Sequence, residues 1–272
     1  MNLLLLAAHL NAQEALVARW STEGVKFQKE QAEARTHVED IAEASLTIYP
    51  ATNGNGKAII ACPGGGYRRL AVAHEGHEMA KWFNKQGITY AVLVYRMPEG
   101  NPETSLYDVQ KAIRILRNNA DKLHIKHIGI MGFSAGGHLA STAATHYNAE
   151  TRPDFQILFY PVITMNPQYT HMGSHDRLLG EQPTTEMEEK YSGELQVTAD
   201  TPPAFILHST DDASVPVRNS INYYLSLLDH GVSATLHLYP TGGHGWGNKD
   251  SFAYKAQWQD ELQQWLKQLK LE

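Results

Sequence analysis

Short apolar runs alternate with helix-like segments through most of this 272-residue chain. The run ITYAVLVY at 88–95 is rich in β-branched and aromatic residues and is typical of a buried strand. The segment GHEMAKWFNKQG at 76–87 precedes it and has the pattern of a helix that ends at a glycine. Strand and helix units repeated at this length place neighbouring strands parallel and cover both faces of the sheet with helices. The alternation therefore predicts an α/β fold with a mostly parallel sheet.

The same pattern locates the expected elements from residue 45 onward. We expect strands at 46–50, 57–62, 88–95, 127–133, 154–160, 203–209 and 234–240. We expect helices at 76–87, from an S-x-x-D start signal at Ser105 and Asp108, at 136–147, at about 217–230 and at about 252–270. The segment 163–201 shows no strand pattern, and a connection of this length is often functional. We expect it to form a small, partly helical cap over the sheet edge.

The first 44 residues differ from the rest of the chain. Residues 13–44 are rich in Glu, Gln and Ala with little apolar periodicity, which predicts a helix-like, peripheral lead-in. Residues 1–12 contain an apolar run that resembles the core of a secretory signal but lacks a basic start. A secreted or periplasmic location and a cytoplasmic one both stay open. Residues 45–272 are expected to form a single domain.

Charge and cysteine content exclude several classes of function. The net charge is −6, the pI is near 6.1 and no Lys/Arg-rich run occurs, so nothing indicates a nucleic acid or an anionic membrane as partner. No apolar stretch is long enough to span a bilayer. Cys62 is the only cysteine, which excludes an internal disulfide, and we expect it to be a small buried residue.

The segment MGFSAGGH at 131–138 follows an expected strand and precedes an expected helix. Its G-x-S-x-G pattern places Gly132 and Gly136 two residues on either side of Ser134. This is the context of a nucleophile elbow, in which a serine with strained backbone geometry needs neighbours without side chains. The following helix would begin beneath the serine, with its dipole near an oxyanion. The pattern predicts that Ser134 is a catalytic nucleophile.

A serine hydroxyl is a weak nucleophile and needs a base, an acid that orients the base, and an oxyanion hole. Asp211 and Asp212 lie just past one late strand, and His244 lies in a glycine-rich loop past the next. Both places are carboxyl ends of strands, where open α/β sheets bind ligands, and the order serine, acid, histidine is that of α/β-hydrolases. Upstream, the glycines of CPGGGY at 62–67 and the amide of Ala135 can supply an oxyanion hole.

Together, the segments CPGGGY, GFSAGGH, DDASVPV and GGHGWG resemble the α/β-hydrolase esterases of the acetyl-xylan-esterase type, a carbohydrate esterase group. The segments 74–98 and 160–180 also resemble this group. The resemblance covers roughly residues 45–270 and does not extend well over the first 44. It implies an α/β-hydrolase fold with a small cap insertion.

The resemblance also implies a role for each matching residue. It makes Ser134 the nucleophile, His244 the general base, Asp212 the acid, and backbone groups of Gly65, Gly66 and Ala135 the oxyanion hole. The family's acid stands four residues before the proline of its D-x-x-V-P pattern, which selects Asp212 and leaves Asp211 as a turn or capping residue. Tyr67 and Trp246 are expected to line the substrate site, where an indole suits stacking on a sugar ring, and a core aromatic role stays open as the alternative for each.

The remaining histidines are expected to have structural roles. The segment HEGHE at 74–78 spaces its histidines three apart, whereas the zincin motif needs four, so we expect no metal site and only a capped helix start. His138 lies one turn into the helix after the nucleophile, which carries it away from the serine. His208 and His237 fall within strands and are expected to be core or face residues.

The sequence therefore predicts a serine carboxyl-ester hydrolase that needs no cofactor and acts on a small-molecule or oligosaccharide ester. The resemblance implies short acyl groups, acetyl above all, on xylan or xylo-oligosaccharides. A feruloyl esterase and a small-ester carboxylesterase stay open as alternatives, because the sequence does not size the acyl pocket. A serine peptidase of the prolyl-oligopeptidase type and a binding module that has lost activity are less favoured. The oligomeric state stays open.

Overall fold

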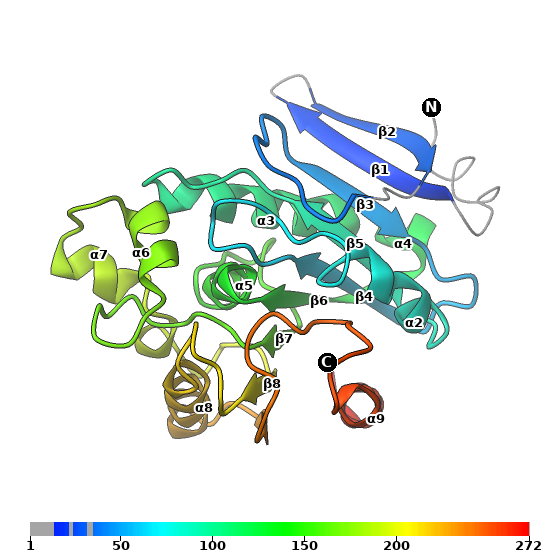
Figure 1. Cartoon of the computed structure of the whole chain (residues 1–272). Helices are drawn as coiled ribbons and strands as arrows, with labels where there is room; N and C mark the ends of the chain where they lie inside the picture. The colour runs from blue at the N-terminus through cyan, green and yellow to red at the C-terminus, as the bar shows by residue number, and fades with distance from the viewer. Residues whose placement is uncertain (1–13, 22–23, 32–34, 272) are drawn as a thin grey trace.

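The computed structural model describes residues 14–21, 24–31 and 35–271. Within these residues, nine strands form one open sheet in the order β2-β1-β3-β5-β4-β6-β7-β8-β9 (Figure 1). The strands are β1 (Glu14–Ser21), β2 (Gly24–Gln31), β3 (Ser45–Tyr49), β4 (Gly56–Cys62), β5 (Thr89–Val94), β6 (Ile125–Phe133), β7 (Phe155–Phe159), β8 (Ala204–Ser209) and β9 (Ala234–Tyr239). Every strand expected from residue 45 onward is present, each within about two residues of its expected bounds.

The sheet is mostly parallel, as the alternation of strands and helices predicts. The run of strands β5, β4, β6, β7, β8 and β9 is parallel throughout. β3, β1 and β2 extend the sheet beyond β5 by antiparallel pairing. Parallel pairing brings the loops after β4, β6, β8 and β9 to one edge of the sheet, although these loops are far apart in the sequence.

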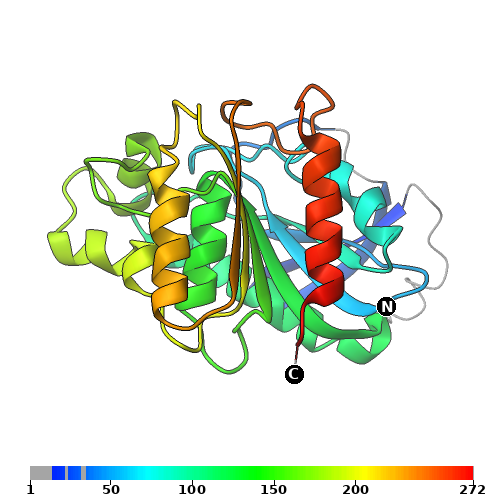
Figure 2. The same cartoon turned by 90° about the horizontal axis from the view of Figure 1, so that it is seen from below.

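Helices cover both faces of the sheet. They are α2 (Ala80–Asn84), α3 (Pro102–Arg117), α4 (Ala120–Leu123), α5 (Ala135–Thr145), α6 (Met172–Leu179), α7 (Thr185–Lys190), α8 (Arg218–Asp229) and α9 (Lys255–Gln268), with 3₁₀ turns η1 (His77–Met79) and η2 (Gly193–Leu195). One apolar cluster joins the sheet to α3, α5 and α8, and a second joins it to α2 and α9. Figure 2 shows the sheet edge-on, with α5 and α8 on one side and α9 on the other. Among the described residues, no helix is long and apolar enough to cross a membrane.

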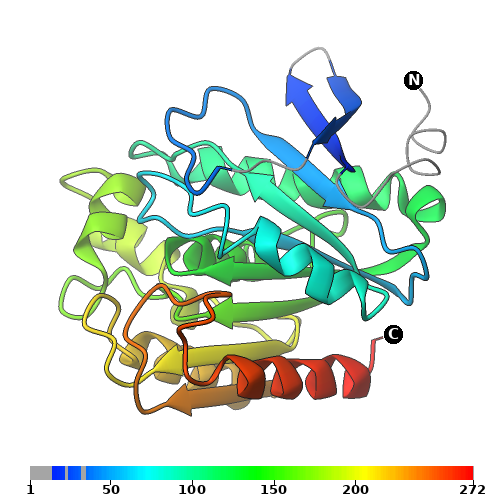
Figure 3. The same cartoon turned by 45° about the vertical axis from the view of Figure 1, so that its right-hand side comes forward.

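The expectation of a helix-like lead-in over 13–44 is wrong for the segments that form β1 and β2. β1 pairs with β3 and buries Leu16 and Ala18 completely, while β2 alternates partly buried Val25 and Phe27 with exposed residues. Pairing with β3 and burial therefore outweigh the helix propensity of Glu, Gln and Ala. The sheet continues across residue 45, and Figure 3 shows the hairpin at the sheet edge far from β9. The signal-like residues 1–12 lie outside the described residues.

The segment 163–201 is partly helical and contains no strand, as expected. It holds α6, α7 and η2, and Figure 1 shows α6 and α7 beyond one end of the parallel strands. One of its contacts with the rest of the domain is a hydrogen bond from Arg177 Nη1 to Gly66 O, at 3.2 Å. The cap therefore contacts the loop that follows β4.

The start signal expected at Ser105 and Asp108 does not begin α3. The helix begins at Pro102, and the side chain of Asn101 accepts the amide of Glu103 as its N-cap. Both polar residues lie inside the helix and bind Arg96 instead: the hydroxyl of Ser105 donates to its carbonyl, and the carboxylate of Asp108 pairs with its guanidinium at 2.7 Å. Proline at the first helical position and the Asn101 cap together fix the start of the helix.

Candidate active site

Ser134 lies at the sharp turn between β6 and α5. Its φ of 54° is in the left-handed region, which a residue with a side chain rarely adopts. A Cβ on Gly132 would lie 2.1 Å from the carbonyl oxygen of Gly136, and one on Gly136 would lie 2.1 Å from the carbonyl oxygen of Cys62. Both positions of the G-x-S-x-G pattern thus need glycine for close backbone packing, and the strand–turn–helix context expected from the sequence is present.

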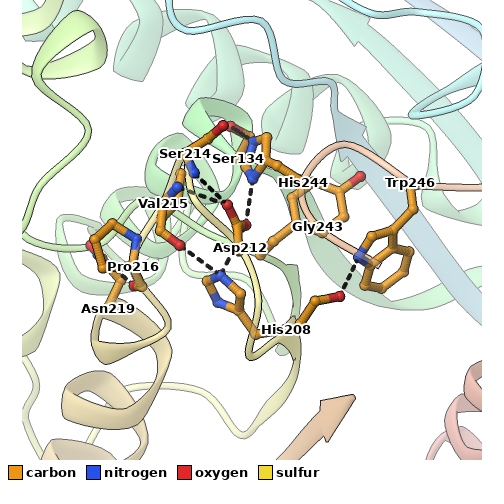
Figure 4. A network of polar contacts seen from close by, with 12 residues as sticks. Ser134, His208, Asp212, Ser214, Val215, Pro216, Asn219, Gly243, His244 and Trp246 are labelled. Carbon is orange, nitrogen blue, oxygen red and sulfur yellow. Dashed lines mark hydrogen bonds and ion pairs between the residues drawn. The ribbon is translucent and has the colours of Figure 1, made fainter. Parts of the chain in front are cut away.

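Three side chains from three strand ends form a continuous hydrogen-bonded chain at this turn. The Oγ of Ser134 lies 2.7 Å from Nε2 of His244, and Nδ1 of His244 lies 2.6 Å from Oδ2 of Asp212 (Figure 4). Ser134 is 7% exposed and Asp212 is 8% exposed. The serine, histidine and carboxylate therefore have the mutual geometry that activation of a serine hydroxyl requires.

The structure separates the two neighbouring aspartates that the residue pattern alone leaves open. The carboxylate of Asp211 accepts the amides of Gly242 and Gly243, at 3.2 and 2.8 Å, and so holds the loop that contains His244. Asp212 is the aspartate that reaches the imidazole. Asp211 has the loop-capping arrangement expected of it, since Asp side chains readily accept backbone amides in turns.

A second histidine, His208, contacts the same carboxylate. Its Nε2 lies 3.2 Å from Oδ2 of Asp212 and 3.0 Å from the carbonyl of Val215, while its Nδ1 lies 2.7 Å from Oγ of Ser220. Two acceptors at Nε2 indicate that this nitrogen bears the proton. Burial favours a higher pKa for Asp212, but hydrogen bonds from His208 and His244 outweigh it and hold that pKa well below its usual range. His208 is a core residue with both ring nitrogens hydrogen-bonded, as expected, but the sequence does not predict its contact with Asp212.

The expected oxyanion loop borders the same cavity as the serine. Gly65 and Gly66 have φ values of 139° and 65°, and a Cβ on Gly65 would lie 2.0 Å from the carbonyl oxygen of Arg69. Within the described part of the chain, no group accepts a hydrogen bond from the amides of Gly65, Gly66 or Ala135. These amides, beside Ser134, are free to bind an oxyanion.

Glu75 lies near the serine, and no sequence pattern predicts a role for it. Its Oε2 accepts the amide of Gly64, and its Oε1 accepts the hydroxyl of Tyr160, both at 2.8 Å. The same hydroxyl accepts the amide of Gly247, also at 2.8 Å. Glu75 is 3% exposed, and its burial raises its pKa against the opposing effect of these hydrogen bonds. One carboxyl group thus links the oxyanion loop to the loop that contains His244.

The HEGHE segment at 74–78 is not a helix start capped by its polar side chains, because η1 begins only at His77 and has no side-chain cap. His77 binds the hydroxyl of Tyr49 at 2.8 Å, and burial lowers the pKa of His74 to about 4. Over the described residues, no group of three His, Cys, Asp or Glu side chains is placed to hold a metal ion.

A cavity of about 450 Å³ opens over Ser134, and most of the side chains that line it are polar. Besides the glycines, its lining residues are His37, Arg68, Arg69, Ala71, His74, Glu75, Ser134, His171, Arg177, Ser214, His244 and Lys249. Ala71 is the single apolar side chain among them. The surface around the serine is therefore suited to a hydrophilic molecule rather than to a long acyl chain.

Comparison with known proteins identifies the family. Residues 46–227 match the model of the BD-FAE family, which is more than half of the chain. The chain belongs to the BD-FAE family. The acetylxylan esterase of Xylanibacter ruminicola is 40% identical over 239 residues, which are 86% of this chain and 50% of that protein. The endo-1,4-beta-xylanase B of Butyrivibrio fibrisolvens is 37% identical over 204 residues, 69% of this chain and 32% of that protein.

A solved structure with a similar fold supports the family assignment. The acetyl ester-xyloside bifunctional hydrolase from Caldicellulosiruptor lactoaceticus superposes with a TM-score of 0.79 at 37% identity, over 84% of the BD-FAE chain and 89% of that structure. The expected α/β-hydrolase fold and esterase resemblance are confirmed, and the family and fold are those of carboxylic ester hydrolases. The chain spans half or less of the length of the two curated relatives.

Two residues expected to line the substrate site of this BD-FAE chain are buried instead. Tyr67 is 2% exposed, and its hydroxyl lies 2.8 Å from Nδ1 of His138, whose Nε2 is bound to a carbonyl. Trp246 is 3% exposed, and its ring is stacked on Phe252 with centroids 4.0 Å apart. One face of the indole is therefore covered by Phe252, and Trp246 borders, together with His244, a separate cavity of about 280 Å³. Both residues lie next to site residues in the sequence, but side chains that follow one another in a turn point in different directions, so sequence proximity does not place them in the site.

Proposed function

We propose that this BD-FAE chain is a serine carboxyl-ester hydrolase that removes short acyl groups, acetyl above all, from carbohydrate such as xylan or xylo-oligosaccharides. The observation that supports the chemistry most is the hydrogen-bonded chain from Ser134 through His244 to Asp212 beside unpartnered glycine amides. Relatives named acetylxylan esterase and acetyl ester-xyloside hydrolase support the substrate.

In the proposed reaction, Nε2 of His244 takes the hydroxyl proton of Ser134 as the serine oxygen attacks the ester carbonyl. The amides of Gly65, Gly66 and Ala135 bind the resulting oxyanion. Collapse of this intermediate expels the sugar hydroxyl, which receives the proton from His244, and leaves an acyl-serine. Water, deprotonated by His244, then attacks the acyl-serine and releases the carboxylic acid.

Asp212 holds the imidazole of His244 in the tautomer that presents a free Nε2 to the serine, and its charge stabilises the imidazolium. The hydrogen bonds that keep the pKa of Asp212 low also keep it ionised throughout the neutral range. His208 supports this arrangement by donating to the same carboxylate oxygen, which fixes the direction of the carboxylate.

The polar lining of the cavity supports a small acyl group on a hydroxyl-rich leaving group. An aromatic acid such as ferulate needs an apolar slot, and Ala71 is the single apolar side chain among the residues that line the cavity. A feruloyl esterase is therefore less well supported than an acetyl esterase, and no separate observation favours a peptidase.

The test is a substrate series with the purified protein. Esters from acetate through octanoate, methyl ferulate and acetylated xylan are assayed with the wild type and with Ser134→Ala. We expect acetate to be the fastest acyl group, acetic acid to be released from xylan, and the variant to lose activity by at least about 10³-fold. Faster ferulate release would overturn the substrate, and full activity of the variant would overturn the mechanism.

A further inference from the structure

Basic side chains gather around the cavity over Ser134, although the chain as a whole has a net charge of −6. Arg68, Arg69, Arg177 and Lys249 all line it. The only carboxylate among the described lining residues is that of Glu75, which is buried and engaged in two hydrogen bonds. The mouth of the site is therefore positive on a negative protein, and a concave surface concentrates such a field.

Arg177 is the basic residue whose position is best fixed. Its Nη1 donates to the carbonyls of Gly66 and Gly173, at 3.2 and 2.6 Å. Gly66 is the oxyanion-loop residue, and a Cβ placed on it would lie 3.8 Å from this nitrogen. The guanidinium therefore sits beside the expected reaction centre. A guanidinium has five N–H donors in a planar fork that matches a carboxylate, and the hydrogen bonds of this one to described residues all come from Nη1.

The other basic groups have little local neutralisation. Arg68 and Lys249 are exposed, and neither forms an ion pair with any described residue. Arg69 has a long contact of 3.9 Å with Glu39, and both side chains are about half exposed, so the pair is weak. Their positive charge remains available to a bound molecule.

Two histidines of the cavity, His74 and His171, contribute little positive charge at neutral pH. Burial lowers the pKa of His74 to about 4 and lowers that of His171 as well. Lys249 acts in the same direction on His74, and Arg177 on His171, which is consistent with the closeness of these groups. The arginine and lysine side chains supply a positive charge that persists throughout the range in which an esterase would work.

We propose that the natural substrate has a carboxylate close to the ester, and that Arg177, Arg68 and Lys249 bind it. This inference rests on the proposed ester hydrolysis and narrows its substrate to anionic esters. On a xylan-type substrate the carboxylate belongs to a uronic acid branch on or next to the acylated sugar. A carboxylate on the acyl group itself is the other source of the same chemistry, and the experiment separates the two.

The experiment compares matched esters at low salt. The first pair is acetylated xylo-oligosaccharides with and without a uronic acid branch, and the second is monoethyl succinate against ethyl butyrate. We expect kcat/KM to be about three- to ten-fold higher for the uronate-bearing oligosaccharide than for the neutral one. We expect this preference to disappear in about 1 M NaCl, where the Debye length is about 3 Å.

Substitutions of the basic residues test whether the preference for the charged oligosaccharide arises in the cavity. In the double variant Arg68→Gln with Lys249→Gln, the ratio of kcat/KM between charged and neutral oligosaccharide should fall well below its wild-type value, and Arg177 should supply the preference that remains. The double variant Lys267→Gln with Lys270→Gln removes an equal charge from exposed positions at the C-terminal end of α9, outside the cavity, and should leave the ratio as in the wild type.

The outcomes are distinguishable. A ratio near one in the wild type, with the neutral acetylated oligosaccharide hydrolysed, overturns this inference and leaves the proposed function standing. A preference for monoethyl succinate alone moves the carboxylate to the acyl group and overturns the uronate assignment. If no ester of either pair is hydrolysed, the proposed function itself fails.

Discussion

Two buried carboxyl groups serve the loops around Ser134, and their surroundings move their pKa values in opposite directions. The pKa of Asp212 lies well below its usual range, whereas that of Glu75 is raised. Burial favours a higher pKa in both cases. Asp212 accepts hydrogen bonds from two imidazoles, and these outweigh its burial. Glu75 accepts one amide and one phenol, and no described Lys or Arg forms an ion pair with it.

The opposite pKa shifts indicate that the two carboxyl groups have different roles. Asp212 keeps a negative charge next to the histidine, whose imidazolium needs it during the proposed reaction. Glu75 joins two loops by accepting from Gly64 and from Tyr160, which in turn accepts from Gly247. At Asp212 the negative charge beside the histidine is the important property. At Glu75 the important property is the hydrogen bonding that positions the two loops. Substitutions that change either the charge or the hydrogen-bonding geometry test this distinction.

The largest expected effect is that of Asp212→Asn. The amide nearly preserves shape but removes the charge and favours the wrong tautomer of His244, so kcat on an acetyl ester should fall by about 10³- to 10⁴-fold. Asp211→Asn is the matched control, because its remaining carbonyl oxygen can still accept a loop amide, and it should cost less than about ten-fold. A larger loss from Asp211→Asn than from Asp212→Asn would reverse the assignment of the acid.

Glu75→Gln should have the next largest effect. If the carboxamide oxygen accepts the amide of Gly64, its NH2 group faces Tyr160, so the Tyr160 hydroxyl loses the acceptor for its own proton and the link is weakened. A shift of the oxyanion loop relative to the histidine loop should lower kcat by about ten- to a hundred-fold and leave KM within about three-fold. Steady-state kinetics on one acetyl ester measures both constants.

Tyr160→Phe provides the matched comparison for Glu75→Gln, since it removes the second half of the same link and leaves the carboxylate in place. The losses of the two variants should not add in the double variant, because both break one connection between two loops. Unchanged kcat in Glu75→Gln, or fully additive losses, would mean that Glu75 does not act through this link.

Stability should depend on pH in opposite ways at the two carboxyl groups. A lowered pKa stabilises the folded protein above the ordinary carboxyl pKa of about 4, and this stabilisation is lost as the pH falls through the folded value. A raised pKa has the reverse sign, so Glu75 increasingly destabilises the folded state as the pH rises above about 4. Denaturant unfolding from about pH 3 to pH 7 measures both.

From low to neutral pH, the unfolding free energy of the wild type should rise relative to Asp212→Asn and fall relative to Glu75→Gln. Equal trends for both variants would remove the distinction between a charged and a positional carboxyl group.

The two regions also differ in how far the sequence predicts them. Ser134, Asp212 and His244 each follow a strand with a recognisable glycine or D-x-x-V-P pattern, and parallel pairing alone brings strand ends together. Glu75 and Tyr160 have no such signal, because they are 85 residues apart and each is defined by a contact that only the folded chain makes. The hairpin of β1 and β2 was missed for a similar reason, since pairing with β3 decides its structure.

The smallest effect concerns Tyr67, which lies at the end of the oxyanion glycines on the Glu75 side. Tyr67→Phe leaves Nδ1 of His138 buried without a donor, which should lower the unfolding free energy by about 1–3 kcal/mol. Because the phenol faces the core and not the cavity, kcat and KM on acetylated xylo-oligosaccharide should stay within about two-fold. Tyr223→Phe, which removes a buried hydroxyl bonded to Gln156, is the matched control for stability. A ten-fold loss of activity in Tyr67→Phe at wild-type stability would mean that Tyr67 contributes to the substrate site. The positional role of the Glu75 region would then extend to the whole glycine loop.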